Sequence, residues 1–532
     1  MTGDQAAKLT IVAHRIRARR AADAASPQIE IDPAIVSSFL SDAAHVPGGF
    51  ATGVAFSRHE GEVAALVAQA TRLLPIGAQS SLTGGATPRG DVVLSTRALN
   101  AIAAPAGHHV RAGAGVPLLE LQRTLASAGL YYPPVPTYEG AFVGGTIATN
   151  AAGAATFKYG STRAWVDGIT VVLASGDVLD VNRGEIAATD ETGFAVVTTA
   201  GATLRVPPLT YVMPAVAKLS AGYFAAPGMD LIDLFIGSEG TLGVVTAATL
   251  RVIPRPRRSL ALIPCVTERQ AIAVAASLRH QAGDAWAGRG PLDVAAVEYI
   301  DARALRALPD EAFMRAGVPR PGAGTVMLLL QIELGSGSAA GAAPPEEAAL
   351  ERLQEVLSAC GVGADPVLSA PGDERGAQRL LDLREAVPAS VNALVAAAKA
   401  AHPEVEKTAG DMVVPFDRLE ESVALYHQAF ASRGLDHAVW GHLSDGNLHP
   451  NLVPRTLADV EAGRDALLEI ARGVVAMGGA PLAEHGVGRS PLKQRLLREL
   501  YGETGIEQMR AVKRALDPDW KLSPGVLFPA SA

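Results

Sequence analysis

The pattern of apolar and polar positions divides the chain into two halves of different texture. In the first half, short apolar runs predict strands at 73–76, 91–95, 109–112, 168–174 and 178–181. Apolar residues at helical spacing predict helices over about 60–70 and 117–128, and Ser57-Arg58-His59-Glu60 before the first helix fits a capping box. The apolar run 231–236 has the same strand-like character as the others. These elements predict a mixed α and β domain that ends near Pro254-Arg255-Pro256.

In the second half, longer helical patterns alternate with strands. Helices are predicted at 268–282, 347–360, 419–432 and 459–477. Strands are predicted at 295–299, 325–333 and 438–442. The small residues of 335–341 are typical of a flexible linker or a loop tip. This alternation predicts a sheet that is covered by helices on one face, and no internal repeat is visible.

Length, charge and cysteine content narrow the class of protein. A chain of 532 residues is expected to form two or three domains. Its net charge of −8 argues against a nucleic-acid-binding protein, and its two cysteines, which form no CxxC pair, argue against a disulfide framework or a thiolate metal site. No apolar run is long enough for a transmembrane helix. We therefore expect a cytoplasmic protein, with peripheral association at a membrane left open.

The N-terminal residues 1–48 are expected to form a tail and a short helix near 33–43. The basic run 14–20 lacks the apolar core of a secretory signal, so we interpret it as the exposed start of a helix, although a transit peptide is also conceivable.

A pair of histidines, His442 and His449, stands on either side of a turn signal. Asp445-Gly446 is typical of a two-residue type I′ hairpin, which requires positive φ at both positions. This turn would place His442 directly opposite His449, about 5 Å apart and able to share a metal ion. Asp445 is expected to stabilise the turn rather than to bind metal. The alternative is a hairpin with two ordinary surface histidines.

Three glycine-rich blocks, 77–85, 133–160 and 237–243, suggest one large phosphate-bearing cofactor that is held by several loops. The alternative is a set of tight turns in a chain that contains 54 glycines. The dinucleotide pattern G-x-G-x-x-G and the Walker A pattern are both absent, so a Rossmann or P-loop cofactor site is not expected.

The order of these blocks resembles the FAD domain of the vanillyl-alcohol-oxidase and p-cresol-methylhydroxylase flavoprotein superfamily. The resemblance implies that the first loop wraps the pyrophosphate of FAD and that the later blocks contact the rest of the cofactor. The residues implied are Ile76, Gly77, Ala78, Gln79, Ser80, Ser81, Leu82, Pro136, Thr137, Gly140, Gly144, Gly145, Ala148, Asn150, Gly153, Tyr159, Gly160, Glu239, Gly243 and Val244. Asn447 is a further candidate to bind flavin or substrate.

The second half resembles the FAD-linked D-2-hydroxyacid dehydrogenases, which include D-lactate dehydrogenases, the glycolate oxidase flavin subunit and D-2-hydroxyglutarate dehydrogenases. The matching motifs are 383–385, 407 with 411–415, 441–451, Glu484-His485-Gly486-Val487-Gly488 and the segment 509–528. The implied fold class is α+β: a two-subdomain FAD-binding domain followed by an α+β cap domain whose antiparallel sheet is covered by helices. The expected divisions are 1–48, 49–256 for the FAD domain, 257–500 for the cap, and 501–532, which returns to the FAD domain.

Within this resemblance, His442, His449 and Glu484 are the expected ligands of a divalent metal, with zinc first and manganese or iron next. His485 is the expected base that removes the substrate hydroxyl proton. The alternative is that His485 binds the metal and that Glu484 supports it without contacting the metal. Arg384 is expected to bind the substrate carboxylate unless it pairs with Glu385 on a helix surface, and Lys407 is a second candidate for the same role.

The implied reaction is the oxidation of a small D-2-hydroxy acid (D-lactate, glycolate or D-2-hydroxyglutarate) to the 2-oxo acid, with hydride transfer to flavin N5. The electron acceptor stays open among oxygen, a quinone, a cytochrome and an electron-transfer flavoprotein, and the assembly stays open between a homodimer and a subunit of a larger complex. Competing hypotheses are a metal-independent flavin oxidase of an alcohol or phenol, and a flavin-binding subunit without catalysis.

Overall fold

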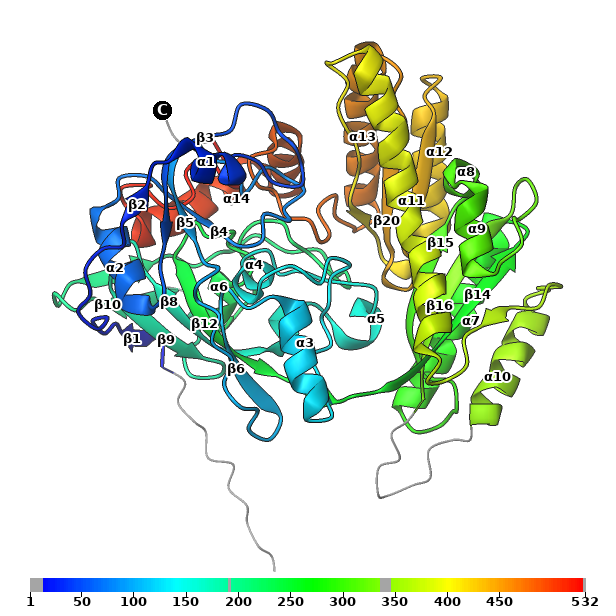
Figure 1. Cartoon of the computed structure of the whole chain (residues 1–532), viewed down its shortest axis with the longest axis horizontal. Coiled ribbons are helices and arrows are strands. Elements are labelled where there is room, and N and C mark those ends of the chain that lie inside the picture. Colours follow the sequence, from blue (N-terminus) through cyan, green and yellow to red (C-terminus); the bar gives the residue numbers. More distant parts are fainter. Residues whose placement is uncertain (1–12, 190–192, 335–345, 530–532) are drawn as a thin grey trace, which may run out of the picture.

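The computed structural model describes residues 13–189, 193–334 and 346–529. The linker predicted at 335–341 lies outside these residues. Two lobes stand side by side (Figure 1), and the chain passes from the first to the second after strand β12. The first lobe is a mixed α and β unit with several small sheets, and the second is built on one large sheet. The predicted α+β fold class is therefore confirmed.

The first lobe contains short strands and helices. Its strands are β1 (Arg15–Arg17), β2 (Ile29–Glu30), β3 (Phe50–Phe56), β4 (Leu73–Ile76), β5 (Arg89–Ser95), β6 (His109–Gly113), β7 (Leu130–Tyr131), β8 (Val166–Val172), β9 (Val178–Asn182), β10 (Phe194–Val197), β11 (Thr203–Val206), β12 (Val244–Arg251) and β13 (Ile253–Pro254). Its helices are α1 (Pro33–Val36), α2 (Glu60–Gln69), α3 (Leu118–Ser127), α4 (Val143–Ala148), α5 (Thr156–Tyr159) and α6 (Leu231–Phe235). Sheet order is β2-β3-β5-β4 in one subdomain, with β3 and β4 parallel to β5, and antiparallel β6-β12-β8-β9 in the other.

The second lobe contains long helices around a seven-stranded antiparallel sheet of order β17-β14-β16-β15-β19-β20-β18. Its strands are β14 (Arg257–Cys265), β15 (Val294–Ile300), β16 (Val326–Leu334), β17 (Val367–Leu368), β18 (Met412–Val413), β19 (His437–His442) and β20 (Asn447–Leu452). Its helices are α7 (Glu268–Trp286), α8 (Ala302–Ala307), α9 (Asp310–Ala316), α10 (Glu346–Ala359), α11 (Glu374–Ala401), α12 (Leu419–Ala431) and α13 (Leu457–Ala476). The last helix, α14 (Pro491–Leu516), lies in the first lobe (Figure 1).

The expectation that helices cover only one face of this sheet is wrong. Along β16, Leu328 and Leu330 pack in the same core as α7 and α12, while Met327 and Leu329 pack with α8, α9 and α11. A strand that is buried on both faces needs apolar residues at nearly every position, which explains the continuous run Val326–Leu330.

After α13 the chain runs back to the first lobe, where α14 and the C-terminal residues lie (Figure 1). The N–H of Leu73 donates to Lys521 O at 2.7 Å, and the N–H of Ser523 donates to Leu73 O at 2.8 Å. Residues 521–523 therefore line the strand that leads into the first glycine-rich block.

Three local expectations are wrong. Residues 231–235 form helix α6 rather than a strand, because the side chain of Asp230 caps the N-terminus by accepting from the N–H of Ile232. Helix α2 begins at Glu60, so Ser57 lies outside it, and Glu62 instead accepts the N–H of Arg58 at 2.7 Å. The basic segment starts no helix: Arg15–Arg17 is strand β1, which pairs with β10. No helix among the described residues is long and apolar enough to cross a membrane.

Candidate active site

The three glycine-rich blocks come together in the first lobe. A side chain at Gly77 would point at Phe142 and Gly145, so the first block faces the start of α4. The third block bonds to the end of the same helix, because the N–H groups of Gly237 and Glu239 donate to Ile147 O and Ala148 O at 2.9 and 2.8 Å. A Cβ on Gly145 would meet nothing within 4 Å among the described residues. The blocks thus form one surface, with open space beside a helix start, which suits a phosphate-bearing cofactor.

The predicted hairpin exists, but its register differs from the prediction. His442 pairs with Asn447 and Trp440 with His449, so the two histidines are not direct partners. Residues 443–445 form a 3₁₀ turn and only Gly446 has positive φ, at 78°, whereas a type I′ turn requires positive φ at Asp445 as well. The expected two-residue turn is therefore wrong. The imidazoles still lie on one face as diagonal neighbours, with ring centroids 5.6 Å apart.

One oxygen of Glu484 lies at the meeting point of these imidazoles. Glu484 Oε1 is 3.3 Å from His442 Nε2 and 3.3 Å from His449 Nε2. A tetrahedral zinc site with bonds of about 2.0–2.1 Å separates its ligand atoms by about 3.3–3.4 Å. The three side chains are buried or nearly so. The two imidazoles and one carboxylate thus have the donor types of a divalent metal site, and Glu484 Oε1 lies at such a spacing from each imidazole.

Each of these side chains also has a charged partner on its outer side. His442 Nδ1 is hydrogen-bonded to Glu298, His449 Nδ1 lies 3.5 Å from Asp411 Oδ1, and Lys218 Nζ donates to Glu484 Oε2 at 2.8 Å. Burial alone would lower the pKa of His442, but Glu298 outweighs burial and raises it to about 9. Outer partners of this kind fix the orientation of metal-binding side chains.

His485 lies beside this cluster and shares a carboxylate with it. Its Nδ1 is 3.2 Å from Asp411 Oδ2, and its Nε2 is 3.6 Å from Glu484 Oε1. Its side chain keeps 27% of its surface exposed, which exceeds the exposure of the other two imidazoles. Burial lowers the pKa of His485 although Asp411 raises it, so the ring is neutral at pH 7. A neutral imidazole held at Nδ1 leaves Nε2 free to accept a proton.

The two residues predicted to bind the substrate carboxylate differ in their surroundings. Arg384, on α11, is buried, and its Nε donates to Glu298 Oε2 at 2.8 Å. The alternative of a surface pair with Glu385 is thus not what the structure shows. Lys407, by contrast, is exposed.

Other predicted cofactor residues connect the lobes. Glu239 accepts the N–H groups of Val487 and Gly488, both at 2.8 Å, and so links the third glycine-rich block to the loop of His485; burial raises its pKa to about 7. The hydroxyl of Tyr159 donates to Glu333 of the second lobe. The Asn447 side chain donates to Asp411 and to Met412 O, and its buried Oδ1 has no partner in the described part of the chain.

The sequence by itself indicates no role for Asp411, Glu298 or Lys218. Asp411 lies in the matched motif 411–415, and this position could have marked it as a functional residue. Glu298 could have been noticed because a charged residue interrupts an otherwise apolar strand. Lys218 has no such signal, because only the structure shows that it is buried.

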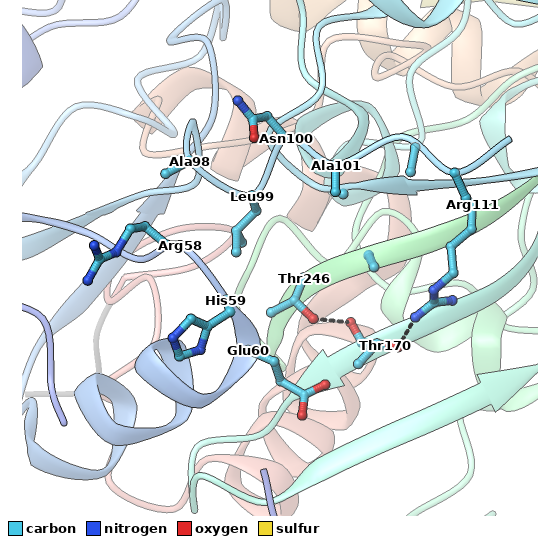
Figure 2. A pocket seen from close by; sticks show the side chains of 14 residues that line it. Arg58, His59, Glu60, Ala98, Leu99, Asn100, Ala101, Arg111, Thr170 and Thr246 are labelled. Carbon is cyan, nitrogen blue, oxygen red and sulfur yellow. Dashed lines mark hydrogen bonds between the residues drawn. The ribbon is translucent and has the colours of Figure 1, made fainter. Parts of the chain in front are cut away.

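A hollow of about 350 Å³ lies on the first lobe, away from this cluster (Figure 2). Arg58, His59 and Glu60 border it at the start of α2, and Asn100 and Arg111 border its other side. None of the residues predicted to bind cofactor, metal or substrate lines it.

A flavin-type cofactor surface next to an imidazole–carboxylate cluster defines the class: a two-lobed flavin-dependent oxidoreductase. Family comparison gives the same assignment. Residues 51–182 match the FAD binding domain, and residues 258–527, about half of the chain, match the C-terminal domain of FAD linked oxidases. The chain belongs to this FAD-linked oxidase family.

Alignments to named relatives cover most of the chain. It is 31% identical over 473 residues to a D-2-hydroxyglutarate dehydrogenase from Xanthomonas citri, covering 87% of this chain and 85% of the relative. It is 29% identical over 466 residues to the glycolate oxidase subunit GlcD of Bacillus subtilis, covering 86% and 84%. It is 28% identical over 461 residues to a D-lactate dehydrogenase from Anaerostipes hadrus, covering 85% and 83%. The chain is thus an FAD-linked oxidoreductase of the type that these relatives represent.

The fold is shared with solved structures at lower identity. A 4-ethylphenol oxidase from Gulosibacter chungangensis superposes with a TM-score of 0.63 at 16% identity, covering 94% of both chains. This likeness confirms the vanillyl-alcohol-oxidase type of fold.

Proposed function

We propose that this enzyme oxidises a small D-2-hydroxy acid to the corresponding 2-oxo acid, using FAD and a divalent metal. The observation that carries the proposal is the adjacency of Glu484 and His485. One residue completes a three-donor metal set and the next supplies a neutral base, in a loop that Glu239 ties to the glycine-rich blocks. The names of the relatives give the substrate class: D-lactate, glycolate and D-2-hydroxyglutarate.

His442, His449 and Glu484 are the metal ligands that the geometry supports best. A different group of donor atoms, from Asp411, His449, Glu484 and His485, lies within 4.8 Å of one another. In that group, however, Asp411 Oδ2 already accepts the N–H groups of Glu484 and His485, each at 2.9 Å, and Oδ1 accepts from Asn447. A carboxylate whose oxygens already accept hydrogen bonds is a poorer metal ligand, so Asp411 orients the imidazoles instead of binding the metal. Zinc fits the donor set first, and manganese or iron next.

When bound, the metal lowers the pKa of the substrate hydroxyl, and FAD accepts the hydride at N5. The side chains of the protein handle the proton. Nε2 of His485 takes the hydroxyl proton as the C–O bond becomes a carbonyl, and Asp411 stabilises the imidazolium that results. Both hydrogens of the H–C–O–H unit are thereby accounted for, one as a proton and one as a hydride.

The carboxylate of the substrate is bound by Arg384, with Lys407 as a second cation. Arg384 uses Nε for Glu298, and its terminal amino groups suit a planar carboxylate. The orphan Oδ1 of Asn447 accepts a hydrogen bond from substrate or flavin. The remaining predicted contacts of FAD with the three glycine-rich blocks are part of the same proposal.

Anaerobic stopped-flow mixing tests the function. The holoenzyme is mixed with D-lactate, glycolate and D-2-hydroxyglutarate, and bleaching of the flavin absorbance is followed. We expect rapid bleaching by at least one acid and, for the chiral acids D-lactate and D-2-hydroxyglutarate, slow or no bleaching by the L-enantiomer. Absence of bleaching by any 2-hydroxy acid would favour a subunit without catalysis.

The role of the metal needs a separate measurement. Chelation, His442→Ala and Glu484→Ala should each remove metal and bleaching together while FAD remains bound. Full turnover of the chelated enzyme would favour a metal-independent oxidase. His485→Ala should keep metal and FAD but abolish flavin reduction.

A further inference from the structure

A buried lysine of the first lobe, Lys218, contacts the metal-ligand segments of the second lobe. Its side chain is wholly buried. Nζ lies 2.8 Å from Glu484 Oε2 and 3.2 Å from Asp445 Oδ2. Asp445 follows His442 by three residues in the turn of the hairpin. One ammonium group therefore joins the hairpin that carries both histidines to the loop that carries the carboxylate.

The two oxygens of Glu484 have different partners. Oε1 faces the two histidines at 3.3 Å, whereas Oε2 is held by Lys218. A carboxylate whose second oxygen is engaged in a charge-assisted hydrogen bond offers one oxygen to a metal. Without this bond, Glu484 could rotate or bind through both oxygens.

The backbone around Lys218 is itself held by cofactor-binding and ligand-bearing segments. The neighbouring Leu219 O accepts from the side chain of Asn150 at 3.2 Å, and Ser220 Oγ donates to Thr149 O at 2.8 Å. The N–H of Ser220 donates to Leu482 O, two residues before Glu484. The position of Nζ is thus set relative to both the second glycine-rich block and the loop of Glu484.

We propose that Lys218 is a positioning residue that holds Glu484 as a single-oxygen metal ligand in register with the flavin-binding loops. This inference rests on the metal site of the proposed function. The ammonium group also repels a divalent ion, so two effects oppose each other. Orientation dominates, because outer partners of metal ligands typically change affinity 10–100-fold, and because two buried carboxylates without their cation would move apart or take up protons.

The test compares Lys218→Met with the wild-type holoenzyme. Metal affinity is measured by competition with a chromophoric chelator, and Co²⁺ absorption in the visible range reports ligand number and geometry. We expect Lys218→Met to bind Zn²⁺ about 10–100-fold more weakly and to change the Co²⁺ spectrum, with FAD still bound. Lys218→Arg, which keeps the cation, should recover most of the affinity.

Lys158→Met is the matched control. Lys158 also joins the lobes, at 2.6 Å from Asp293 and 2.7 Å from Glu333, but it touches no predicted metal ligand. Its loss should leave Zn²⁺ affinity and the Co²⁺ spectrum unchanged. If Lys218→Met does not retain FAD, Asp445→Asn removes the second partner of the lysine and should weaken Zn²⁺ binding to a smaller extent.

The outcomes separate the two proposals. A wild-type enzyme that binds neither Zn²⁺ nor Co²⁺ overturns the metal site and this inference together. A wild-type enzyme that binds metal, with Lys218→Met or Asp445→Asn unchanged in affinity and Co²⁺ spectrum, overturns the role of Lys218 alone.

Discussion

Asp411 Oδ2 lies 3.2 Å from Nδ1 of His485 and accepts the backbone N–H of the same residue at 2.9 Å. One carboxylate therefore holds both the ring and the backbone of the proposed base. Burial by itself would raise the pKa of Asp411, but His485 and His449 hold it well below its usual range. The group is thus an anion at every pH at which the enzyme is expected to work.

Replacing Asp411 by Asn should impair catalysis without removing the base. Asn keeps the size of the side chain but loses the charge that selects the Nδ1–H form of His485 and stabilises its protonated state. We expect the rate of flavin reduction to fall roughly 10²–10⁴-fold, the range of a general base. Asp310→Asn, at an exposed position on α9, is the control. An unchanged reduction rate in Asp411→Asn would show that this carboxylate only supports the fold.

The pH profile of the wild-type enzyme should reflect His485. Its pKa is lowered, by burial first, so the neutral form prevails above an apparent pKa below the ordinary value of about 6.5. We expect kcat/KM to rise with pH through this lower value and to be flat at neutral pH. In Asp411→Asn the acid limb should move to still lower pH, because an anion that favours the protonated ring is gone. Movement to higher pH would contradict this assignment.

Arg384→Lys should weaken substrate binding. Lys keeps the charge but cannot offer the planar pair of donors or maintain the same contact with Glu298. A lost charged hydrogen bond of about 1.5–3 kcal/mol corresponds to roughly a 10–100-fold increase in KM. Arg379→Lys, at an exposed position on the same helix, is the control. Metal content is measured alongside, because Glu298 also holds His442; equal KM values in both variants would remove Arg384 from the substrate site.

Gly488→Ala should destabilise the loop that joins base and cofactor. Gly488 has φ of +58°, and its added Cβ would lie 2.2 Å from Thr83 Oγ1 in the first glycine-rich block. We expect lower FAD retention and a lower Tm. Gly228 has a similar φ of +63°, but its added Cβ would meet nothing within 4 Å among the described residues, so Gly228→Ala should show only the backbone cost of about 1–2 kcal/mol. Equal effects in the two variants would exclude the clash as the cause.

The hairpin that carries His442 and His449 could be predicted from the sequence only in part. Asp445-Gly446 correctly indicated a reversal of the chain, and His442 and His449 do converge. The register is wrong because Asp445 takes part in a 3₁₀ turn and pairs with Lys218, a contact that lies more than two hundred residues away in the sequence. The two imidazoles still converge, because residues two apart on a strand share a face and diagonal neighbours on paired strands can therefore meet.

The same limit applies to the residues that support the site. Asp411, Glu298 and Lys218 act through contacts between segments that no spacing rule connects, whereas Glu484-His485 could be found because both roles lie within one motif. In the fold, strand positions were predicted well where apolar runs were short and bounded. The run 231–236 failed because periodicity alone does not distinguish a short buried helix from a strand.

The return of the chain to the first lobe after α13 has a mechanical consequence. The second lobe is connected to the first at both of its ends, through the passage from β13 to β14 and through the segment between α13 and α14. Two connections restrict rotation of one lobe against the other. The second of these segments carries Glu484 and His485, and just beyond them the N–H of Arg489 donates to Thr83 O of the first glycine-rich block. Opening of the lobes would therefore pull on that block.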